Sequence, residues 1–455
     1  MDPPQEYIPL PAPGADEDQP SPSYSLSLPR RVLSFTIMTL FILTILALGL
    51  VNEFSPVSEP GYLRKMSLNS HPSMQTEPVM PDFSNYGDKL QNLSNADLHF
   101  MRNRGRLIII GDIHGMVNAL NKLLVKLNYD STKDKLVHVG DIITKGTTEG
   151  SLAVLSQLAA NECVRGNHDQ TVIEWRGWFD WVRSYPSGAK WFDSLKDDNR
   201  RKRRRPPKKF PIPRYWNWDG EHCRLASRLS DEHYRYLLSL PLVLHLPSLH
   251  AHVVHAGLLP LDPTRSPKSG KQPLSHLPFL GNTAQLTKGH KTSRLRAAQE
   301  IAVVKEIPQN QDSWVNLNMR SVLDNGVVTK RSDIGRPWAE IWATVLKRCD
   351  GFGDVKSTSH SALIRHRQDE IELRSVLDDV VAESTSLVCH PFTVIYGHAA
   401  ARGLDIKKWS IGLDTGCVYG RRLSADIGEG GLKVESNFGF GNNQGSAKIV
   451  SISCR

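Results

Sequence analysis

A short apolar run followed by Gly-Asp or Gly-Asn occurs three times between residues 106 and 167, and it limits the possible folds more than any other feature. Residues 106–110 (RLIII) and 136–139 (LVHV) are mostly apolar, and the shorter, partly charged stretch 162–165 (ECVR) is the third. Leucines recur at helical spacing between the first two runs, and residues 149–160 have the same periodicity. Alternating strands and helices predict parallel βαβαβ units at the start of an α/β domain.

Residue types that bind metals follow each of the three runs. Asp112 and His114 follow the first run, Asp141 the second, and Asn167 and His168 the third. Open α/β sheets bind ligands at the carboxyl ends of their strands. One Asp after a strand is more often a helix N-cap, but three such groups in order predict a metal site. Carboxylate, imidazole and amide ligands suit Mn, Fe or Zn, and a shared carboxylate holds two ions about 3.5–4 Å apart.

Five motifs in order resemble the signature of the calcineurin-like metallophosphoesterases. They are GDIHG at 111–115, GDIITKG at 140–146, RGNHD at 165–169, VVHAGL at 253–258 and YGH at 396–398. LDTGCVYGRRLSA at 413–425 is similar to the bacterial diadenosine-tetraphosphatase branch. Together with an amino-terminal anchor, the motifs resemble the fungal vacuolar, zinc-dependent endopolyphosphatases of that branch. The resemblance covers about residues 105–425 and implies a metallophosphoesterase β-sandwich flanked by helices.

The resemblance also implies two divalent metal ions, with Zn as the first choice and Mn, Co or Fe as alternatives. The implied ligands are Asp112, His114, Asp141, Asn167, His255 and His398, with Asp141 shared between the ions. A hydroxide bridging the ions would attack phosphorus in line. His168 would protonate the departing oxygen. Lys145 and Arg165 are candidates for binding the substrate phosphates. They are also candidate catalytic residues, together with Asp141 and His168.

The second motif departs from the pattern of the protein phosphatases in this family. They have Gly-Asp-x-x-Asp-Arg-Gly, whereas Thr144 and Lys145 replace the second Asp and the Arg here. A threonine cannot charge the catalytic imidazole, and a lysine binds phosphate only as a point charge. A leaving phosphate needs little protonation because its second pKa is about 6. We therefore predict hydrolysis of phosphoanhydride bonds, foremost the internal bonds of polyphosphate. The alternatives are a dinucleoside polyphosphate hydrolase, a Ser/Thr protein phosphatase and an inactive, metal-binding lumenal scaffold or receptor.

A segment of twenty uncharged residues at 32–51 predicts a transmembrane helix, since it is long enough to cross a bilayer. Residues 1–31 are rich in proline and acidic residues, and we predict a disordered tail. A cleaved signal peptide is the alternative, but its apolar region is usually shorter and nearer the amino terminus.

Charges beside the predicted span indicate its orientation. Arg30 and Arg31 precede it and favour a cytoplasmic amino terminus, although Arg64 and Lys65 on the other side nearly balance them. We predict a single-pass type II membrane protein with a lumenal carboxy-terminal domain. The resemblance alone places that domain in the vacuole.

The remaining regions are assigned by composition. Residues 52–104 are predicted to be a stalk, in which Asn92 begins an Asn-Leu-Ser glycosylation acceptor. The catalytic domain is predicted over residues 105–430, with an insert at 171–245, and residues 431–455 are predicted to be a strand or tail. A hydrophobic content of 40% with 23% charged residues is typical of a globular protein and excludes a wholly disordered chain.

The insert contains two unusual stretches. Trp175, Trp178 and Trp181 are three residues apart, which predicts packing on a helix, with stacking against a nucleobase as the alternative. Residues 200–209, RRKRRRPPKK, are predicted to be a solvated loop. Attraction of a polyanion and a dibasic processing site are the alternatives. We expect no specific binding of nucleic acid.

The six cysteines show no Cys-x-x-Cys pattern that would predict a zinc site. Cys163, Cys389 and Cys417 flank predicted strands and are interpreted as buried thiols. A lumenal location would also permit disulfides.

Overall fold

The computed structural model describes residues 79–93, 105–159, 161–194, 205–267, 269–280, 288–352, 386–429, 439–440 and 445–455. All of them lie in one compact unit, Thr76–Arg455. The predicted tail 1–31 and the predicted span 32–51 lie outside the described residues. Among the helices of the described ranges, none is both long and apolar enough to cross a membrane.

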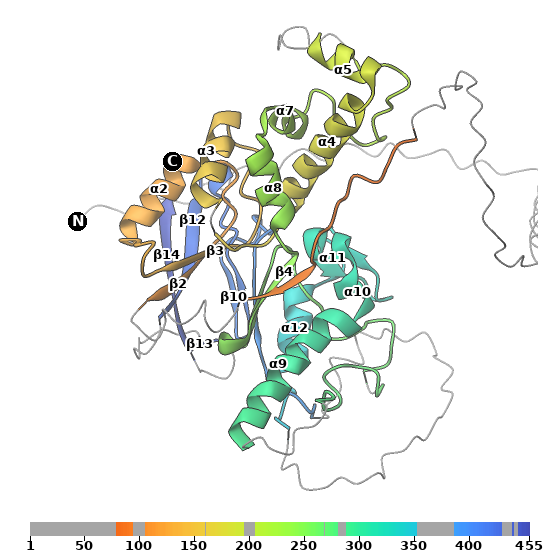
Figure 1. The fold of residues 1–455 in the computed structure, drawn as a ribbon. Helices are drawn as coiled ribbons and strands as arrows, with labels where there is room; N and C mark the ends of the chain where they lie inside the picture. The colour runs from red at the N-terminus through yellow and green to blue at the C-terminus, as the bar shows by residue number, and fades with distance from the viewer. Residues whose placement is uncertain are drawn as a thin grey trace, which may run out of the picture. The chain divides into compact units, whose positions relative to one another are not determined.

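Two β-sheets form the centre of this unit (Figure 1). The six-stranded sheet has the order β1-β4-β5-β9-β11-β10, from β1 Leu90–Asn92, β4 Val243–Leu246, β5 Ala251–Val254, β9 Thr393–Tyr396, β10 Asp405–Lys407 and β11 Ser410–Gly412. The five-stranded sheet has the order β13-β14-β12-β2-β3, from β2 Arg106–Ile110, β3 Lys135–His138, β12 Arg422–Glu429, β13 Gly439–Phe440 and β14 Gly445–Ser453. A small third sheet has the order β7-β6-β8, from β6 Ser321–Val322, β7 Val328–Thr329 and β8 Arg336–Pro337.

Successive side chains of a strand point to opposite faces of its sheet, and the apolar inner faces of the two large sheets pack against each other. Leu107 and Ile109 of β2 share one buried cluster with Val253 of β5, so this cluster fills the space between the sheets. Ile108 and Ile110 point to the opposite face of β2 and join a second cluster with helices. The predicted sandwich flanked by helices is therefore confirmed.

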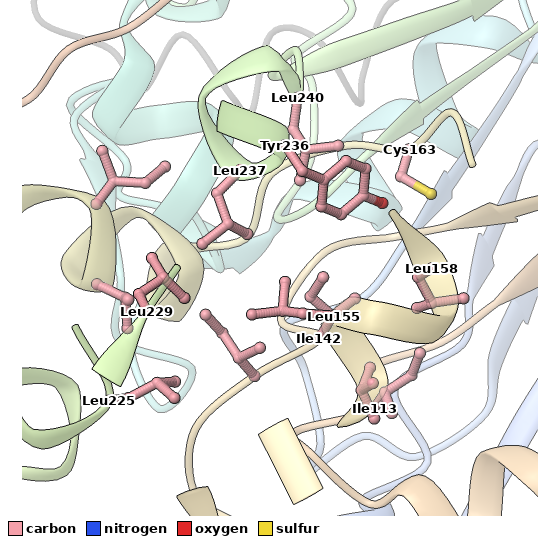
Figure 2. Packing of buried hydrophobic residues seen from close by; sticks show 14 of the residues in the cluster. Ile113, Ile142, Leu155, Leu158, Cys163, Leu225, Leu229, Tyr236, Leu237 and Leu240 are labelled. Atoms are coloured by element: carbon pink, nitrogen blue, oxygen red, sulfur yellow. The ribbon is translucent and has the colours of Figure 1, made fainter. Parts of the chain in front are cut away.

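Helices cover the outer faces of both sheets. The cluster outside the five-stranded sheet contains residues of α2 Val117–Lys126, α3 Thr148–Leu158, α4 Asn167–Arg183, α5 Pro186–Asp193, α7 Glu221–Arg228 and α8 Asp231–Ser239. The cluster outside the six-stranded sheet contains residues of α9 Lys288–Glu306, α11 Ser313–Asn318 and α12 Trp338–Leu346. Three short helices are also present in the described ranges: α10 Pro308–Gln311, η2 Pro247–Leu249 and η3 Cys417–Tyr419. Figure 2 shows part of the first cluster, to which Leu155 of α3 and Leu237 of α8 belong.

The tryptophans of the insert pack inside the protein. Trp175 and Trp178 of α4 are buried, and their rings contact that of Trp218. The packing interpretation is confirmed for these two side chains, and Trp181 is partly buried against the same cluster.

Residues 162–165, predicted to be the third strand, do not form a strand. The Val164 N–H donates to His138 O at 3.3 Å, and the Arg165 N–H donates to Pro241 O at 2.9 Å. Residues 162–165 therefore donate one hydrogen bond to each of two neighbouring segments and form no β-ladder with either. The predicted βαβαβ start is therefore a βαβα unit followed by an extended segment.

Residues 79–93, predicted to be part of the stalk, belong to the folded unit. Strand β1 pairs in parallel with β4 at the edge of the six-stranded sheet. Phe83 and Leu93 are buried in two different core clusters. The fold therefore includes chain that precedes the predicted boundary at residue 105, because these apolar side chains are covered by distant elements.

The carboxy-terminal residues also belong to the fold. Strand β14 pairs with β12 over eight residues, beyond the predicted boundary at residue 430. Disulfides join Cys349 to Cys389 and Cys417 to Cys454. The interpretation of Cys389 and Cys417 as thiols is wrong, whereas Cys163 is a buried free thiol as predicted.

Replacing Cys417 and Cys454 by serine should lower the free energy of unfolding by about 2–4 kcal/mol, because the disulfide closes a loop with a sequence separation of 37. Urea unfolding monitored by tryptophan fluorescence measures the change. Reduced wild-type protein, alkylated after its disulfides are opened, is the control and should be at least as unstable. An unchanged unfolding midpoint in the double variant would contradict the expectation.

Candidate active site

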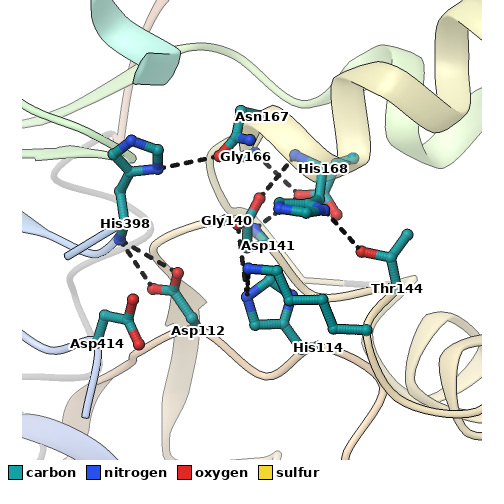
Figure 3. Close-up of polar contacts among 12 residues, drawn as sticks. Asp112, His114, Gly140, Asp141, Thr144, Gly166, Asn167, His168, His398 and Asp414 are labelled. Carbon is teal, nitrogen blue, oxygen red and sulfur yellow. Dashed lines mark hydrogen bonds and ion pairs between the residues drawn. The ribbon is translucent and has the colours of Figure 1, made fainter. Parts of the chain in front are cut away.

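The side chains predicted to bind metal meet at one edge of the sandwich, although they come from distant parts of the sequence (Figure 3). Asp112 follows β2, Asp141 follows β3, His255 follows β5 and His398 follows β9, while Asn167 begins α4. All of these except the fully buried His255 line a pocket with a volume of about 210 Å³. Its lining residues are Asp112, Asp141, Lys145, Asn167, His168, Asn318, Arg320, Lys330, His398, Ala400, Asp414 and Tyr419.

Asp141 lies at the centre of the site. In one group its carboxylate is within 4.8 Å of ligand atoms of Asp112 and His114, and in a second group it is within 4.8 Å of those of His255 and His398. Its Oδ2 atom is 3.6 Å from His114 Nε2 and 3.4 Å from His255 Nε2. Asp141 is the only residue that these two groups share. A carboxylate that bridges two ions must belong to both ligand groups, as Asp141 does.

Hydrogen bonds orient the imidazoles toward the site. His114 Nδ1 lies 3.3 Å from Ile143 O, and His255 Nδ1 lies 2.8 Å from Val139 O. Each Nδ1–H can donate to its carbonyl, which leaves Nε2 as the lone-pair nitrogen on the side of Asp141. His398 is reversed, with Nε2 near Asn318 O at 3.2 Å and Nδ1 near Asn167 Oδ1 at 3.0 Å. Such bonds fix the tautomer of metal-binding histidines.

Buried carboxylates create a strong demand for positive charge here. Burial and the neighbouring Asp414 carboxylate raise the pKa of Asp112 well above its usual range. Burial opposes ionisation of Asp141, but the His255 imidazole beside it keeps its pKa well below the usual range. Burial would lower the pKa of His255, yet Asp141 raises it to about 9. This arrangement fits divalent cations, since uncompensated buried charges are costly and the oxygen and imidazole donors suit such ions.

The backbone of the site is strained. Eight non-glycine residues of the described ranges have positive φ, and five of them surround this pocket: His114 (50°), Asp141 (52°), Thr144 (71°), Lys145 (54°) and His398 (64°). Residues held in this region cost free energy and cluster at functional sites. Two glycines allow the close approach that this geometry needs, because a Cβ on Gly397 would overlap the Asp112 carboxylate and one on Gly166 would overlap that of Asp141.

Asp169 holds the metal-ligand loops together. Its carboxylate accepts hydrogen bonds from the N–H groups of Gly166 and Asp141 at 2.9 Å and of Ile142 at 3.2 Å. Burial and the nearby Asp141 raise the pKa of Asp169 to about 7. Asp169 ends the RGNHD motif, which was the sequence signal for this role. It joins the loop after β3 to the first turn of α4.

Arg165 does not line the pocket, contrary to the prediction. Its side chain is fully buried, and its guanidinium donates to Gln170 Oε1 at 2.9 Å, Asn85 O at 3.3 Å and Leu238 O at 2.9 Å. These bonds connect the segment before β1 to α4 and α8. The geometry therefore gives Arg165 a structural role and does not support the predicted substrate contact.

Lys145 lies in the pocket as predicted, and two further cations line it. Lys145 Nζ is 3.1 Å from His114 Nε2. Arg320 and Lys330 are the additional basic residues of the lining, and Arg320 donates to His398 O at 3.0 Å. Sequence reasoning missed both, because they lie in a segment without a recognised motif.

His168 contacts the insert through an imidazole that the sequence analysis did not single out. His168 Nδ1 lies 3.1 Å from Thr144 Oγ1 and 2.9 Å from His222 Nε2. The rings of His168 and His222 are stacked, with centroids 5.0 Å apart. Glu221 Oε2 accepts from the Lys145 N–H at 2.8 Å, and Glu221, His168 and His222 form a third group that could hold a metal. Helix α7 of the insert thus contributes to the active site.

Replacing His222 by alanine should lower kcat about tenfold and leave the two metals of the main site in place, because His168 would lose the ring that orients it while the six metal ligands remain. Steady-state kinetics and metal analysis of the purified protein measure both effects. His276→Ala, at an exposed histidine, is the matched control. Loss of both metals together with activity would contradict an orienting role.

Comparison with known families identifies part of the chain. Residues 105–238 match the family model described as calcineurin-like phosphoesterase. The chain is 36% identical over 88 residues to Serine/threonine-protein phosphatase 1 of Salmonella typhimurium, covering 19% of this chain and 40% of that protein. It is 38% identical over 81 residues to a symmetrical bis(5'-nucleosyl)-tetraphosphatase of Coxiella burnetii, covering 18% and 27%. The chain therefore spans less than half the length of these curated relatives.

Solved structures show weaker similarity. A chain described as a diadenosine tetraphosphatase gives a TM-score of 0.40 at 21% identity, covering 81% of this chain and 98% of that one. A protein serine/threonine phosphatase from Saccharomyces cerevisiae gives 0.36 at 11% identity, covering 81% and 84%. Scores this low add nothing to the fold described above.

Residues 105–238 are thus similar to the calcineurin-like phosphoesterases, a family that uses two divalent metals, and the two ligand groups that share Asp141 fit that number. The segment contains Asp112, His114, Asp141 and Asn167, whereas His255 and His398 lie beyond it and reach the site through the fold. The names of the two curated relatives give different substrates, a protein and a dinucleoside tetraphosphate. These names therefore do not identify one substrate class for this chain.

Proposed function

We propose that this protein is an endopolyphosphatase, a dinuclear metal hydrolase that cuts internal phosphoanhydride bonds of inorganic polyphosphate. The observation that carries the proposal is the surroundings of His168. Burial, with positive charge at Lys145, lowers its pKa to about 3 despite Asp141. Its Nδ1 contacts a hydroxyl and a second imidazole, neither of which supplies negative charge. A neutral imidazole is a weak acid, which favours a leaving group that departs without protonation, such as a phosphate.

The side chains of the pocket have separate roles in this proposal. When bound, two divalent cations supply water activation and neutralise the phosphoryl oxygens. Asp141, with His114 and His255 beside it, would hold both cations in place. Lys145, Arg320 and Lys330 would bind the phosphates on either side of the scissile bond, and His168 would hydrogen-bond the departing oxygen.

A dinucleoside polyphosphate is the second candidate substrate, and one side chain favours it. Tyr419 lines the pocket and is 61% exposed, so its ring can stack on a nucleobase. The Coxiella relative adds support for a nucleotide substrate. A protein phosphatase activity ranks lower, because Thr144 replaces the carboxylate that would charge His168 for the departure of a serine alkoxide.

We also propose a lumenal location for the catalytic unit, with the segment at 32–51 as a single-pass type II anchor in the vacuolar membrane. The two disulfides support this part of the proposal, since disulfides persist in oxidising compartments. Asn92 is exposed on the edge strand β1, which suits glycosylation at its acceptor motif. Digestion of protein from intact vesicles with an N-glycosidase, compared with Asn92→Gln, tests the orientation.

One assay tests the proposed activity. The purified full-length protein is incubated with long polyphosphate and Zn, Mn, Co or Mg, and the products are separated on a gel. We expect a ladder of intermediate lengths with little free phosphate early in the reaction, because trimming from the ends would release one phosphate with every cut. Release of free phosphate without intermediates, or faster hydrolysis of diadenosine tetraphosphate or of a phosphopeptide, would contradict the proposal.

A further inference from the structure

A second pocket, which we call the arginine pocket, has a volume of about 550 Å³. Its lining residues are Gly403, Leu404, Thr415, Gly420, Arg421, Arg422, Ser453 and Arg455. The side chains supply three guanidinium groups and two hydroxyls but no carboxylate. All three arginines are exposed, and no carboxylate side chain of the described residues forms an ion pair with them. Unpaired guanidinium groups gathered in one concave surface favour an anion.

The arginine pocket shares a wall with the metal pocket. Asp414 and Tyr419 line the metal pocket, while the residues that follow each of them, Thr415 and Gly420, line the arginine pocket. The Arg421 guanidinium donates to the carbonyl of Ala400, which is itself part of the metal pocket. Residues 414–421 therefore border both pockets, which places the arginine pocket next to the metal pocket.

The wall is held in place by covalent and hydrogen bonds. The disulfide between Cys417 and Cys454 ties the end of β14 to η3. The Cys454 N–H donates to Arg421 O at 3.0 Å, and Arg455 Nε donates to Gly420 O at 3.2 Å. Because these bonds already fix the backbone beneath the arginines, ligand binding costs little backbone conformational entropy there.

We infer that the arginine pocket binds the part of a linear polyphosphate chain that extends beyond the metal pocket. This inference rests on the proposed function and deepens it. Polyphosphate carries negative charge at every repeat, so any segment that leaves the metal pocket can satisfy the guanidinium groups of Arg421, Arg422 and Arg455. The pocket therefore selects long chains and supports cutting away from the chain ends.

The test uses the full-length Arg421→Ala/Arg422→Ala variant in two measurements. The first is binding of fluorescently labelled long polyphosphate to protein freed of metal with EDTA, which does not depend on catalysis. The second is KM and kcat for long polyphosphate, tripolyphosphate and bis(p-nitrophenyl) phosphate in the metal-loaded protein. We expect binding of the long chain to weaken about tenfold and its KM to rise by a similar factor, with the bis(p-nitrophenyl) phosphate rate within twofold of wild type.

Two further variants make the result specific. Arg183→Ala/Arg235→Ala removes the same charge from exposed positions on α4 and α8, and it should leave binding of the long chain within twofold of wild type. Arg422→Ala/Arg455→Ala keeps Arg421, which packs over Gly416, and replaces the first variant if that one fails to fold. It should also weaken binding of the long chain about tenfold.

Equal binding of long polyphosphate by wild type and both arginine-pocket variants would overturn the inference. A KM increase for diadenosine tetraphosphate, without one for long polyphosphate, would also overturn it and assign the pocket to a nucleotide. If wild-type protein cuts no polyphosphate with any metal, but the variants still lose binding of the long chain, the proposed function fails and the arginine pocket stands as a polyanion site.

Discussion

Replacing Asp141 by asparagine should lower kcat for polyphosphate hydrolysis by about 10³-fold or more and leave the protein with fewer than two bound divalent ions. Asp141 is the residue common to both ligand groups, within 3.6 Å of His114 and 3.4 Å of His255. An asparagine keeps the shape but supplies one neutral oxygen where two cations need a shared carboxylate. Losing a bound cation removes several kcal/mol of transition-state stabilisation, which corresponds to this factor.

Metal analysis and kinetics on the same preparation measure this effect. Asp324→Asn, at an exposed carboxylate, is the matched control and should retain both metals and full activity. Thermal unfolding with and without EDTA should differ in wild type and differ much less in the variant, because bound metal stabilises only the folded state. The role given to Asp141 is wrong if its asparagine variant keeps two metals and more than a tenth of wild-type activity.

Replacing His168 by alanine should change the dependence of the rate on the leaving group. For phenyl phosphate, whose phenolate has a pKa near 10, kcat/KM should fall by about 10²-fold, because the hydrogen bond from the neutral His168 imidazole to the departing phenolate is lost. For long polyphosphate the loss should stay below about tenfold, because the departing phosphate needs little protonation. Measuring kcat/KM for both substrates in wild type and variant checks the difference.

A second variant tests the departure in the motif directly. Thr144→Asp places a carboxylate beside His168 Nδ1, where Thr144 Oγ1 now lies at 3.1 Å, and aspartate tolerates the positive φ of this position. We expect hydrolysis of phenyl phosphate to rise about tenfold relative to polyphosphate. Equal losses of both activities in His168→Ala, or no gain for phenyl phosphate in Thr144→Asp, would mean that proton donation does not select the substrate.

Local patterns predicted the elements that depend on neighbouring residues. The apolar runs at 106–110 and 136–139 are strands, and the periodic segments after them are helices, because alternation and helical spacing reflect which side chains must be buried. Asp112, Asp141 and Asn167 were predicted as ligands for the same reason, since each follows a recognisable run, and the structure brings them together in one pocket. His255 and His398 depended on resemblance, as neither has a distinctive local pattern.

Predictions failed where a residue's environment comes from distant chain. Residues 162–165 were predicted to pair as a strand, but they lie between two neighbours that each offer one hydrogen bond. Arg165 was predicted to contact the substrate, but its guanidinium donates hydrogen bonds to carbonyl oxygens of the segment before β1 and of α8. The thiols of Cys389 and Cys417 were misread because their partners, Cys349 and Cys454, are 40 and 37 residues away.

The sequence alone determined that this chain forms an α/β sandwich with carboxylate and imidazole ligands at the strand ends, because hydrophobic periodicity and motif order are local properties. Tertiary structure decided which further groups surround those ligands. Asp414 lies 302 residues from Asp112 and His222 lies 54 residues from His168, while the arginine pocket combines residues 403–422 with the carboxy-terminal residues 453 and 455. The physical reason is that a side chain's charge state and ligand depend on its neighbours in space, and a one-dimensional pattern specifies only its neighbours along the chain.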